Sequence, residues 1–388
     1  MPLSNKFSSK LPHVGTTIFT TMSNMAAEYD AINLSQGFPD FPVPDELINL
    51  LTKYLKKGLN QYPPMIGVEY LRQEIMRKVD KLYDVKVDMF NEITVTSGAT
   101  EALFVAIQTL IRPGDEVIIF DPAYDSYEPA ITLAQGKTIH VDMDLESTTK
   151  SGIDWEKVKT KINHQTRAII LNSPHNPSGR VLEQSDIEAL TKLISNTDIF
   201  LISDEVYEHM VFDGLRHISL LENEFLRSRS FIISSFGKTY HATGWKVAYC
   251  IAPSELTSEF RKIHQFVTFT THTPTQWAIA EFMEYHSDHY LNLPNFYQLK
   301  RDLFLDQLTN SKFKLRPTTG TYFQLADYSE ISDLSDVEFA NYLTQEIGVA
   351  AIPISVFYDV LPKSRYVRFC FAKNNETIIQ ACEKLKVI

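Results

Sequence analysis

Between about residue 92 and residue 251, short runs of apolar, mostly β-branched residues alternate with segments that have helical spacing. Each run is apolar along nearly its whole length, which is typical of strands that a sheet buries on both faces. Strands that alternate with helices along a chain indicate a mostly parallel sheet with helices on both sides. We therefore predict an α/β fold, with strands at 93–96, 117–120, 168–171, 199–202, 231–234 and 247–251.

The chain before this region is polar and irregular as far as Ile32–Leu34, and glycine and proline interrupt it from Gly37 onward. Each proline restricts its own backbone and that of the residue before it, which predicts a connecting loop. Asp45 is placed to cap a helix that continues to about Lys56.

After about residue 281 the pattern changes to helical segments, followed by strand-like runs near 320–326 and 366–371. This pattern indicates a second, smaller α+β domain. We expect three parts, which are an N-terminal segment at 1–45 that joins the small domain, a large domain at 46–280, and the small domain at 281–388.

Charge and cysteine content narrow the class of protein. The chain carries 37 basic and 48 acidic side chains, a net charge of −11, which disfavours nucleic acid or an anionic membrane as a partner. No apolar run reaches the roughly 18 residues of a membrane span, residues 1–20 lack a signal-peptide core, and the three cysteines lack CxxC spacing. His286 and His289 have no supporting carboxylate cluster. We expect a cytoplasmic protein without a metal site.

The clearest chemical signal is the segment Ser234–Thr239, in which a strand runs into two hydroxyls, a glycine and Lys238. Ligands of open α/β sheets bind at the carboxyl ends of the strands. There the amine of Lys238 could capture a carbonyl compound, because burial or a neighbouring cation such as Lys246 lowers a lysine pKa. A solvent-exposed lysine after a strand is the simpler alternative.

Asp204 directly follows the apolar run 199–202. A carboxylate at the end of a buried strand is costly unless it has a partner, and a protonated ring nitrogen of a cofactor would be one. An ordinary helix N-cap is the alternative.

The segment Thr96–Glu101 joins a strand to a helix through Ser97, Gly98, Ala99 and Thr100. Free backbone N–H groups and the helix dipole make such a junction a site for an anion, and the glycine permits close approach. A normally capped helix without a ligand would have the same sequence.

Three further residues follow or interrupt apolar strands. Asn176 lies in a turn with two prolines and can donate a hydrogen bond to an oxyanion, and Tyr124 offers an aromatic face after the strand 117–120. Arg368 lies within a strand-like run and needs an anionic partner, for which a substrate carboxylate would fit. A structural turn, core packing and an internal ion pair are the respective alternatives.

Together, a carbonyl-capturing lysine, an acid for a ring nitrogen, an anion site, a stacking aromatic and a carboxylate-binding arginine describe a pyridoxal phosphate site. The chain resembles the class I/II aminotransferases of fold type I, most closely those of the methionine/aromatic or kynurenine type. Asn33–Asp40, Ser234–Thr239, Thr243–Val247 and Val367–Phe369 carry this resemblance. The resemblance implies a mostly parallel seven-stranded sheet and a smaller α+β domain, with pyridoxal 5'-phosphate as the cofactor.

The resemblance also implies a role for each motif residue. Lys238 would bind the cofactor covalently and later carry the proton that moves during transamination, and Asp204 would pair with the ring nitrogen. Asn176 and Tyr207 would hold the phenolic oxygen of the ring, and Tyr124 would stack on the ring face. The phosphate would be bound by Ser97, Gly98, Ala99, Thr100, Ser235 and Lys246, and the substrate carboxylate by Gly37, Asn176 and Arg368.

The resemblance further implies a homodimer, because Gln61–Tyr62 resembles the segment whose tyrosine reaches the phosphate in the partner subunit. It also implies that the Asp121–Pro122 and Asn176–Pro177 bonds are cis. Many relatives have arginine where Lys246 stands, so a monodentate cation takes its place here.

The expected reaction is transamination between an amino acid and a 2-keto acid. From Ile263 to Leu299 the chain has no Lys or Arg to bind a second carboxylate, and it offers Phe266, Phe269, His272 and Trp277 instead. The loop near Ile18–Phe19 adds more apolar surface. We therefore expect a neutral, large apolar or aromatic substrate such as methionine. Interface packing would also explain these aromatics. Kynurenine transamination or β-elimination from cysteine conjugates, and a non-enzymatic sensor domain, remain alternatives.

Overall fold

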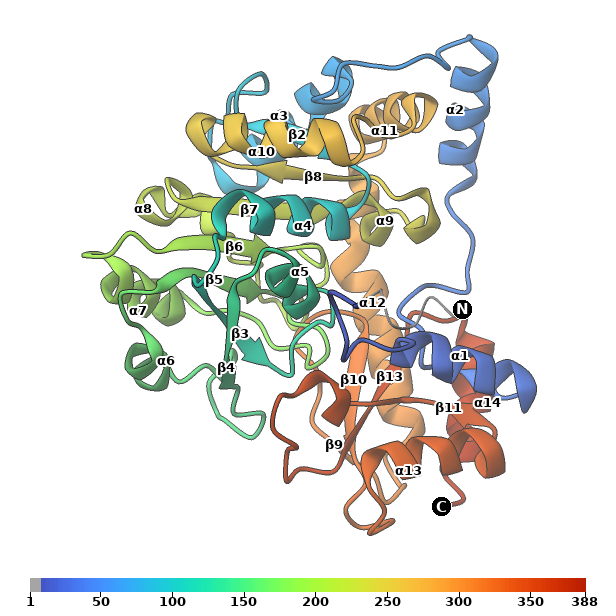
Figure 1. Cartoon of the computed structure of the whole chain (residues 1–388). Coiled ribbons are helices and arrows are strands. Elements are labelled where there is room, and N and C mark those ends of the chain that lie inside the picture. The colour runs from blue at the N-terminus through green and yellow to red at the C-terminus, as the bar shows by residue number, and fades with distance from the viewer. Residues whose placement is uncertain (1–7) are drawn as a thin grey trace, which may run out of the picture.

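The computed structural model describes residues 8–388, and its largest element is a seven-stranded sheet with the order β2-β8-β7-β6-β5-β3-β4 (Figure 1). The pairs among β3 to β7 are parallel, whereas β8 is antiparallel to β2 and β7. The strands are β2 (Ile93–Thr96), β3 (Glu116–Asp121), β4 (Lys137–Asp142), β5 (Thr166–Asn172), β6 (Phe200–Asp204), β7 (Ser230–Ser235) and β8 (Ala248–Ile251).

Helices cover both faces of this sheet, as the continuous apolar strands predict. Alternate residues of β5 belong to opposite layers, because Ala168 packs in the layer with α4, α5 and α10, and Ile169 packs in the layer with α2, α3, α7 and α11. These helices and two shorter ones are α2 (Asp45–Lys56), α3 (Glu69–Tyr83), α4 (Ala99–Leu110), α5 (Tyr127–Leu133), α6 (Trp155–Lys161), α7 (Gln184–Ile194), α8 (Glu224–Arg227), α10 (Ser254–Val267) and α11 (Thr273–Tyr285).

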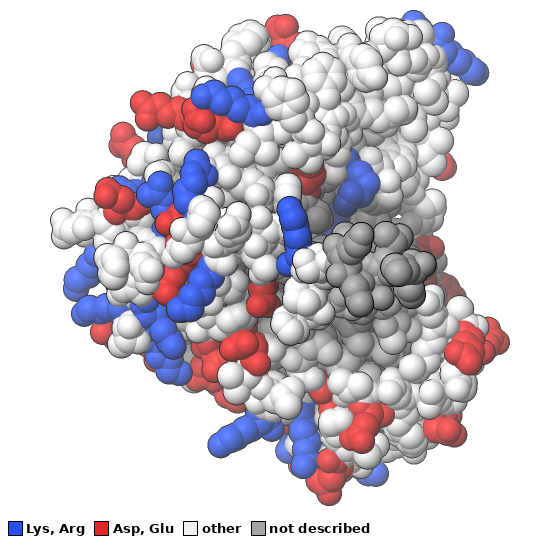
Figure 2. Space-filling view, viewed as in Figure 1, with Lys and Arg blue, Asp and Glu red and all other residues white. Residues whose placement is uncertain are grey.

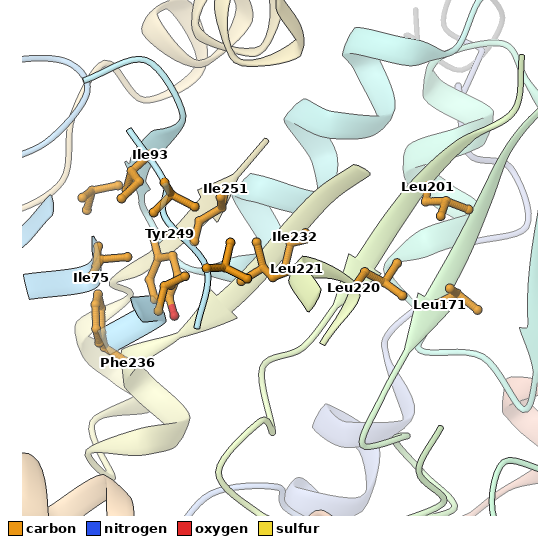
Figure 3. Packing of buried hydrophobic residues seen from close by; sticks show 14 of the residues in the cluster. Ile75, Ile93, Leu171, Leu201, Leu220, Leu221, Ile232, Phe236, Tyr249 and Ile251 are labelled. Carbon is orange, nitrogen blue, oxygen red and sulfur yellow. The ribbon is translucent and has the colours of Figure 1, made fainter. Parts of the chain in front are cut away.

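The second layer is continuous across the sheet. Figure 3 shows Leu171, Leu201, Ile232 and Ile251 of four neighbouring strands in one buried cluster, which Leu220 and Leu221 of a connecting segment join. Burial of each such side chain contributes about 1.5–3 kcal/mol to the free energy of unfolding, so this layer holds the strand ends in place.

A separate four-stranded sheet, β12-β13-β10-β9, forms the core of the C-terminal part. A short parallel pair of β1 and β11 attaches the N-terminal segment to this part, and Figure 1 shows α1 beside β11 and α14. The elements are α1 (Ile18–Glu28), β1 (Ile32–Asn33), α12 (Ser287–Gln307), β9 (Lys314–Leu315), β10 (Phe323–Asp327), α13 (Asp336–Tyr342), β11 (Val349–Ala350), β12 (Ile352–Pro353), β13 (Tyr366–Cys370) and α14 (Asn375–Leu385).

The structure departs from the sequence-based expectation at three places. The N-terminal region, which was expected to be irregular, contains the helix α1. Met22 and Ala26, one helical turn apart on this helix, are buried, and Met22 packs in the core of the C-terminal part. The edge strand β4 was not among the predicted strands, because most of its residues are half-buried or exposed and its sequence is polar. Asp45 is the first residue of α2, and Pro44 is its N-cap.

Candidate active site

A cavity of about 240 Å³ lies where the carboxyl ends of β5, β6 and β7 face the C-terminal part. Segments far apart in the sequence meet there, from the N-terminal segment through the large sheet to β10 and β13. Of the residues predicted to bind the cofactor or the substrate carboxylate, all except Ser97 and Tyr62 line the cavity, namely Gly37, Gly98, Ala99, Thr100, Tyr124, Asn176, Asp204, Tyr207, Ser235, Lys238, Lys246 and Arg368. The side chains expected beside an apolar substrate, Phe266, Phe269, His272 and Trp277, do not line it.

Lys238 lies in α9 (Phe236–Thr239), the single helical turn that follows β7. Its Nζ donates hydrogen bonds to the carbonyl oxygen of Gly37 at 3.1 Å and to the hydroxyl of Tyr322 at 2.8 Å. Within residues 8–388, no carboxylate lies within ion-pair distance of this amine, and burial lowers its pKa to about 8. Part of the amine is therefore neutral near pH 7 and can act as a nucleophile.

Asp204 ends β6 and is 4% exposed. Its Oδ2 accepts a hydrogen bond from the hydroxyl of Tyr127 at 2.7 Å, and its Oδ1 accepts one from the backbone N–H of Val206 at 3.3 Å. Burial raises the pKa of Asp204 to about 6, against the opposing effect of the Tyr127 hydrogen bond. Turns rather than a helix follow Asp204, so the helix N-cap alternative is wrong.

Gly98, at the N-cap of α4, has a φ of +86° that favours glycine. A Cβ atom at Gly98 would lie 3.0 Å from Nζ and 2.8 Å from Cε of Lys246, so the end of this lysine side chain lies directly against the helix N-terminus. The N–H groups of the first helical turn have no intrahelical partners. A cation and a helix N-terminus at one end of the cavity make a site for an anion.

The side chains of Glu101 and His264 stabilise the backbone of this junction. The Oε2 atom of Glu101 accepts a hydrogen bond from the backbone N–H of Ser97 at 3.0 Å. The Oε1 atom of Glu101 lies 2.8 Å from Nδ1 of His264, whose Nε2 lies 3.3 Å from the carbonyl oxygen of Met65.

Arg368 lies in the middle of β13 and is fully buried. Its Nη1 donates to Oδ1 of Asn176 at 2.8 Å and its Nη2 to the carbonyl oxygen of Ser35 at 2.9 Å, while its Nε has no hydrogen-bond partner in the described chain. The guanidinium lies 3.9 Å from the ring centre of Phe323. Among residues 8–388 no carboxylate pairs with Arg368, so the internal ion pair is not found. A buried cation of this kind requires an anionic ligand.

The structure adds residues that the sequence analysis did not select. Tyr127 holds Asp204, Tyr322 contacts Lys238, and Phe323 adds to the apolar wall that Phe19 was expected to form. Tyr127 follows β3 in the same segment as Tyr124, so its position shortly after a predicted strand could have suggested it. Tyr322 comes from another part of the chain, and only the tertiary structure brings it to the lysine.

Two aromatic residues named in the sequence analysis lie outside the cavity of their own chain. Tyr62, which the resemblance assigns to the partner subunit's phosphate, is 83% exposed and packs edge-on against Phe269. Trp277 is half-buried and packs against Tyr54 and Tyr70. The Asp121–Pro122 and Asn176–Pro177 bonds are both cis as expected, and so is Ser173–Pro174, which the sequence analysis did not select.

Comparison with known proteins gives the family. A model for class I and II aminotransferases matches residues 29–385. Methionine aminotransferase of Escherichia coli is 50% identical over 379 residues, which cover 97% of both proteins. The chain belongs to the class I and II aminotransferases. Kynurenine–oxoglutarate transaminase 1 of Homo sapiens is 33% identical to this aminotransferase, with 93% of each chain covered.

Solved structures of other aminotransferases have the same fold. The Escherichia coli methionine aminotransferase matches with a TM-score of 0.95 at 48% identity, over 98% of this chain and 99% of that chain. N-succinyldiaminopimelate aminotransferase from Mycobacterium tuberculosis matches with a TM-score of 0.94 at 34% identity, over 98% and 99% of the two chains. This aminotransferase is therefore a fold-type I enzyme that depends on pyridoxal phosphate.

Neither a membrane-spanning helix nor a metal-binding cluster of side chains occurs within residues 8–388. No helix there has the length and apolar character needed to cross a membrane. No group of three or more His, Cys, Asp or Glu side chains there is arranged to hold a metal ion.

Proposed function

We propose that this aminotransferase moves the amino group of methionine, or of a similarly large apolar or aromatic amino acid, to a 2-keto acid. One observation carries the substrate class. The cavity offers a single buried arginine, Arg368, for a carboxylate, and its other walls include apolar side chains from Phe19, Leu103 and Phe323.

The side chains present fit pyridoxal phosphate. Lys238 offers a partly neutral amine for the aldehyde, and Asp204 offers a buried carboxylate for the ring nitrogen. The N-terminus of α4 and Lys246, with Thr100 and Ser235 nearby, offers donors for the phosphate. When bound, the cofactor supplies an aldehyde that condenses with amino groups and a ring that accepts the electron pair left at the α-carbon of the substrate.

The remaining residues would orient the reactants. Tyr124 would stack on the ring, and Asn176 and Tyr207 would donate to its phenolic oxygen. Arg368, which lines the cavity, would bind the α-carboxylate of the substrate, while Asn176 and Gly37 complete that end of the cavity. Lys238 would carry the proton between the two carbon atoms that exchange it during each half-reaction.

The cavity and the segment from Ile263 to Leu299, which has no Lys or Arg, offer no free cation for a distal carboxylate, and this argues against a dicarboxylate substrate. The cationic side chains that line the cavity are Lys238, Lys246 and Arg368, and each has a role in the proposal above. A second carboxylate against Phe19 and Phe323 would lose its hydration without a compensating charge, which is costly in a partly dry pocket. A methionine side chain gains about 0.8 kcal/mol for each methylene buried there.

We expect kcat/KM for methionine to exceed that for aspartate by at least about 100-fold with the same keto acid, because an unpaired charge in the pocket costs several kcal/mol. Phenylalanine and kynurenine should fall between the two. Steady-state rates with each amino donor test this order, and a preference for aspartate would contradict the proposed substrate class. Kynurenine is an informative second amino donor, because one relative of this enzyme is a kynurenine–oxoglutarate transaminase.

We further propose that the enzyme is a homodimer in which Tyr62 reaches the phosphate site of the partner subunit. Tyr62 and Phe266 are 83% and 86% exposed, and Phe269 lies beside Tyr62 at a ring separation of 5.5 Å. Large exposed aromatics in one cluster mark interaction surfaces. Figure 2 supports this, because acidic and basic side chains are interspersed over much of the face shown, whereas the surface over α11 at the upper right is mostly uncharged.

Sedimentation at assay concentration should give a dimer, and Tyr62→Phe should weaken cofactor affinity by about tenfold, since one hydrogen bond to a charged phosphate contributes about 1.5–3 kcal/mol. Tyr285→Phe, another exposed tyrosine (68%), is the matched control and should leave the affinity unchanged. A fully active monomer would argue against shared sites.

The proposed division of the chain is 46–280 for the cofactor-binding domain and 281–388 for the small domain, joined by 1–45, of which residues 1–7 lie outside the described part. The parallel pairing of β1 with β11 supports the attachment of the N-terminal segment to the small domain. The buried, free cysteines Cys250, Cys370 and Cys382 support our placement of the enzyme in the reducing cytoplasm.

A further inference from the structure

The hydroxyl of Tyr322 lies between the catalytic lysine and the N-terminal segment. It donates a hydrogen bond to the carbonyl oxygen of Gly37 at 2.5 Å and accepts one from Nζ of Lys238 at 2.8 Å. Nζ also donates to the Gly37 carbonyl at 3.1 Å, so the three groups close a triangle. Lys238 comes from the proposed large domain, Tyr322 from the small domain and Gly37 from the N-terminal segment. The triangle therefore brings all three parts of the chain together at the Nζ atom of Lys238.

The direction of these hydrogen bonds follows from the chemistry of the carbonyl. The Gly37 carbonyl can only accept, so the single hydroxyl hydrogen of Tyr322 is directed toward it. The lone pairs of the Tyr322 oxygen are then left to face Nζ. Tyr322 therefore acts as an acceptor for the lysine amine and favours its protonated form.

We propose that Tyr322 is a positioning residue for Lys238, and that its hydroxyl holds the amine beside the Gly37 carbonyl whenever that amine is not bound to the cofactor. This inference rests on the proposed function of Lys238 as anchor and proton carrier. A proton carrier that is released in each half-reaction must remain within reach of the substrate α-carbon, and two fixed acceptors restrict where its nitrogen can lie.

Core packing alone is the competing explanation for Tyr322. Its fully buried ring lies 5.3 Å from the ring of Tyr207, 5.6 Å from that of Tyr297 and 4.9 Å from that of Phe323. Tyr322→Phe keeps all of these ring contacts and removes only the hydroxyl. Tyr297→Phe is a matched control, because Tyr297 is also fully buried and packs on Tyr322, but its hydroxyl lies 3.0 Å from Nδ1 of His241.

The first test measures the lysine amine itself. The full-length enzyme is loaded with pyridoxamine phosphate, which leaves Lys238 free, and the rate of its acetylation by acetic anhydride at pH 7 is followed by peptide mass spectrometry. Asp204, Cys370, Arg368 and Lys246 act on this amine in every variant alike. Loss of the Tyr322 acceptor should lower the pKa of Lys238 by about 1 and accelerate its acetylation about fivefold. Tyr297→Phe should match the wild-type rate.

The second test measures the kinetic consequence. Tyr322→Phe should lower kcat about tenfold and leave the KM for methionine within about twofold, because the substrate contacts are intact while the proton carrier is less well placed. Equal acetylation and equal kcat in Tyr322→Phe and wild type would overturn the inference. Failure of the proposed function has a different signature, in which loading with pyridoxal phosphate does not protect Lys238 from acetylation.

Discussion

Replacement of Lys238 by alanine is expected to reduce transamination by at least about four orders of magnitude, because we propose that this one side chain supplies both the covalent anchor and the moving proton. The cavity offers no substitute on the described chain, since Lys246 lies at the anion end and Arg368 is a guanidinium that does not deprotonate. Borohydride reduction of the wild-type holoenzyme should fix the cofactor to the peptide that contains residue 238, and the variant should retain none.

Lys300→Met is the matched control for this experiment. Lys300 is also a buried lysine, but its Nζ donates to the carbonyl oxygen of Lys373 outside the cavity, and methionine keeps its apolar stem. This control should retain the cofactor and turn over at a rate near wild type. A Lys238→Ala protein with borohydride-fixed cofactor and full turnover would show that another residue is the anchor.

Replacement of Asp204 by alanine is expected to slow each half-reaction by about three orders of magnitude while the fold persists. A buried carboxylate beside the ring nitrogen keeps that nitrogen protonated, and the protonated ring is what draws electrons from the substrate. Asp204 is 4% exposed and its pKa is raised to about 6 by burial, so a cation at the ring nitrogen would both stabilise the carboxylate and be stabilised by it. Single-turnover absorbance changes of the cofactor measure this rate directly.

Two companion variants separate charge from packing at Asp204. Asp204→Asn keeps the size of the side chain and a partner for the hydroxyl of Tyr127, and should be nearly as slow as alanine. Tyr127→Phe keeps the carboxylate and loses one hydrogen bond, and should slow the half-reaction only about tenfold. A half-reaction in Asp204→Asn as fast as wild type would refute the role of the carboxylate.

Much of this site could be predicted because each motif is local. Lys238, Asp204, Asn176 and the Ser97–Thr100 junction all follow an apolar strand within a few residues, and parallel strands present their carboxyl ends at one edge. A strand that is apolar along its length is recognisable without its neighbours. The residues that follow it are therefore placed at the site as soon as the sheet is predicted.

The sequence by itself determined six of the seven strands of the large sheet, the edge at which ligands bind and the residues that we propose for the cofactor. It did not determine that Tyr322 contacts Lys238, that Tyr127 holds Asp204, or that Glu101 and His264 support the anion site. It also placed Trp277 near the substrate, although that half-buried ring packs against Tyr54. These contacts join residues separated by tens to hundreds of positions, and a helix or strand pattern specifies only which face is buried. The partner of a buried face is decided when helices and strands from distant parts of the chain pack together, which is a property of the whole tertiary structure.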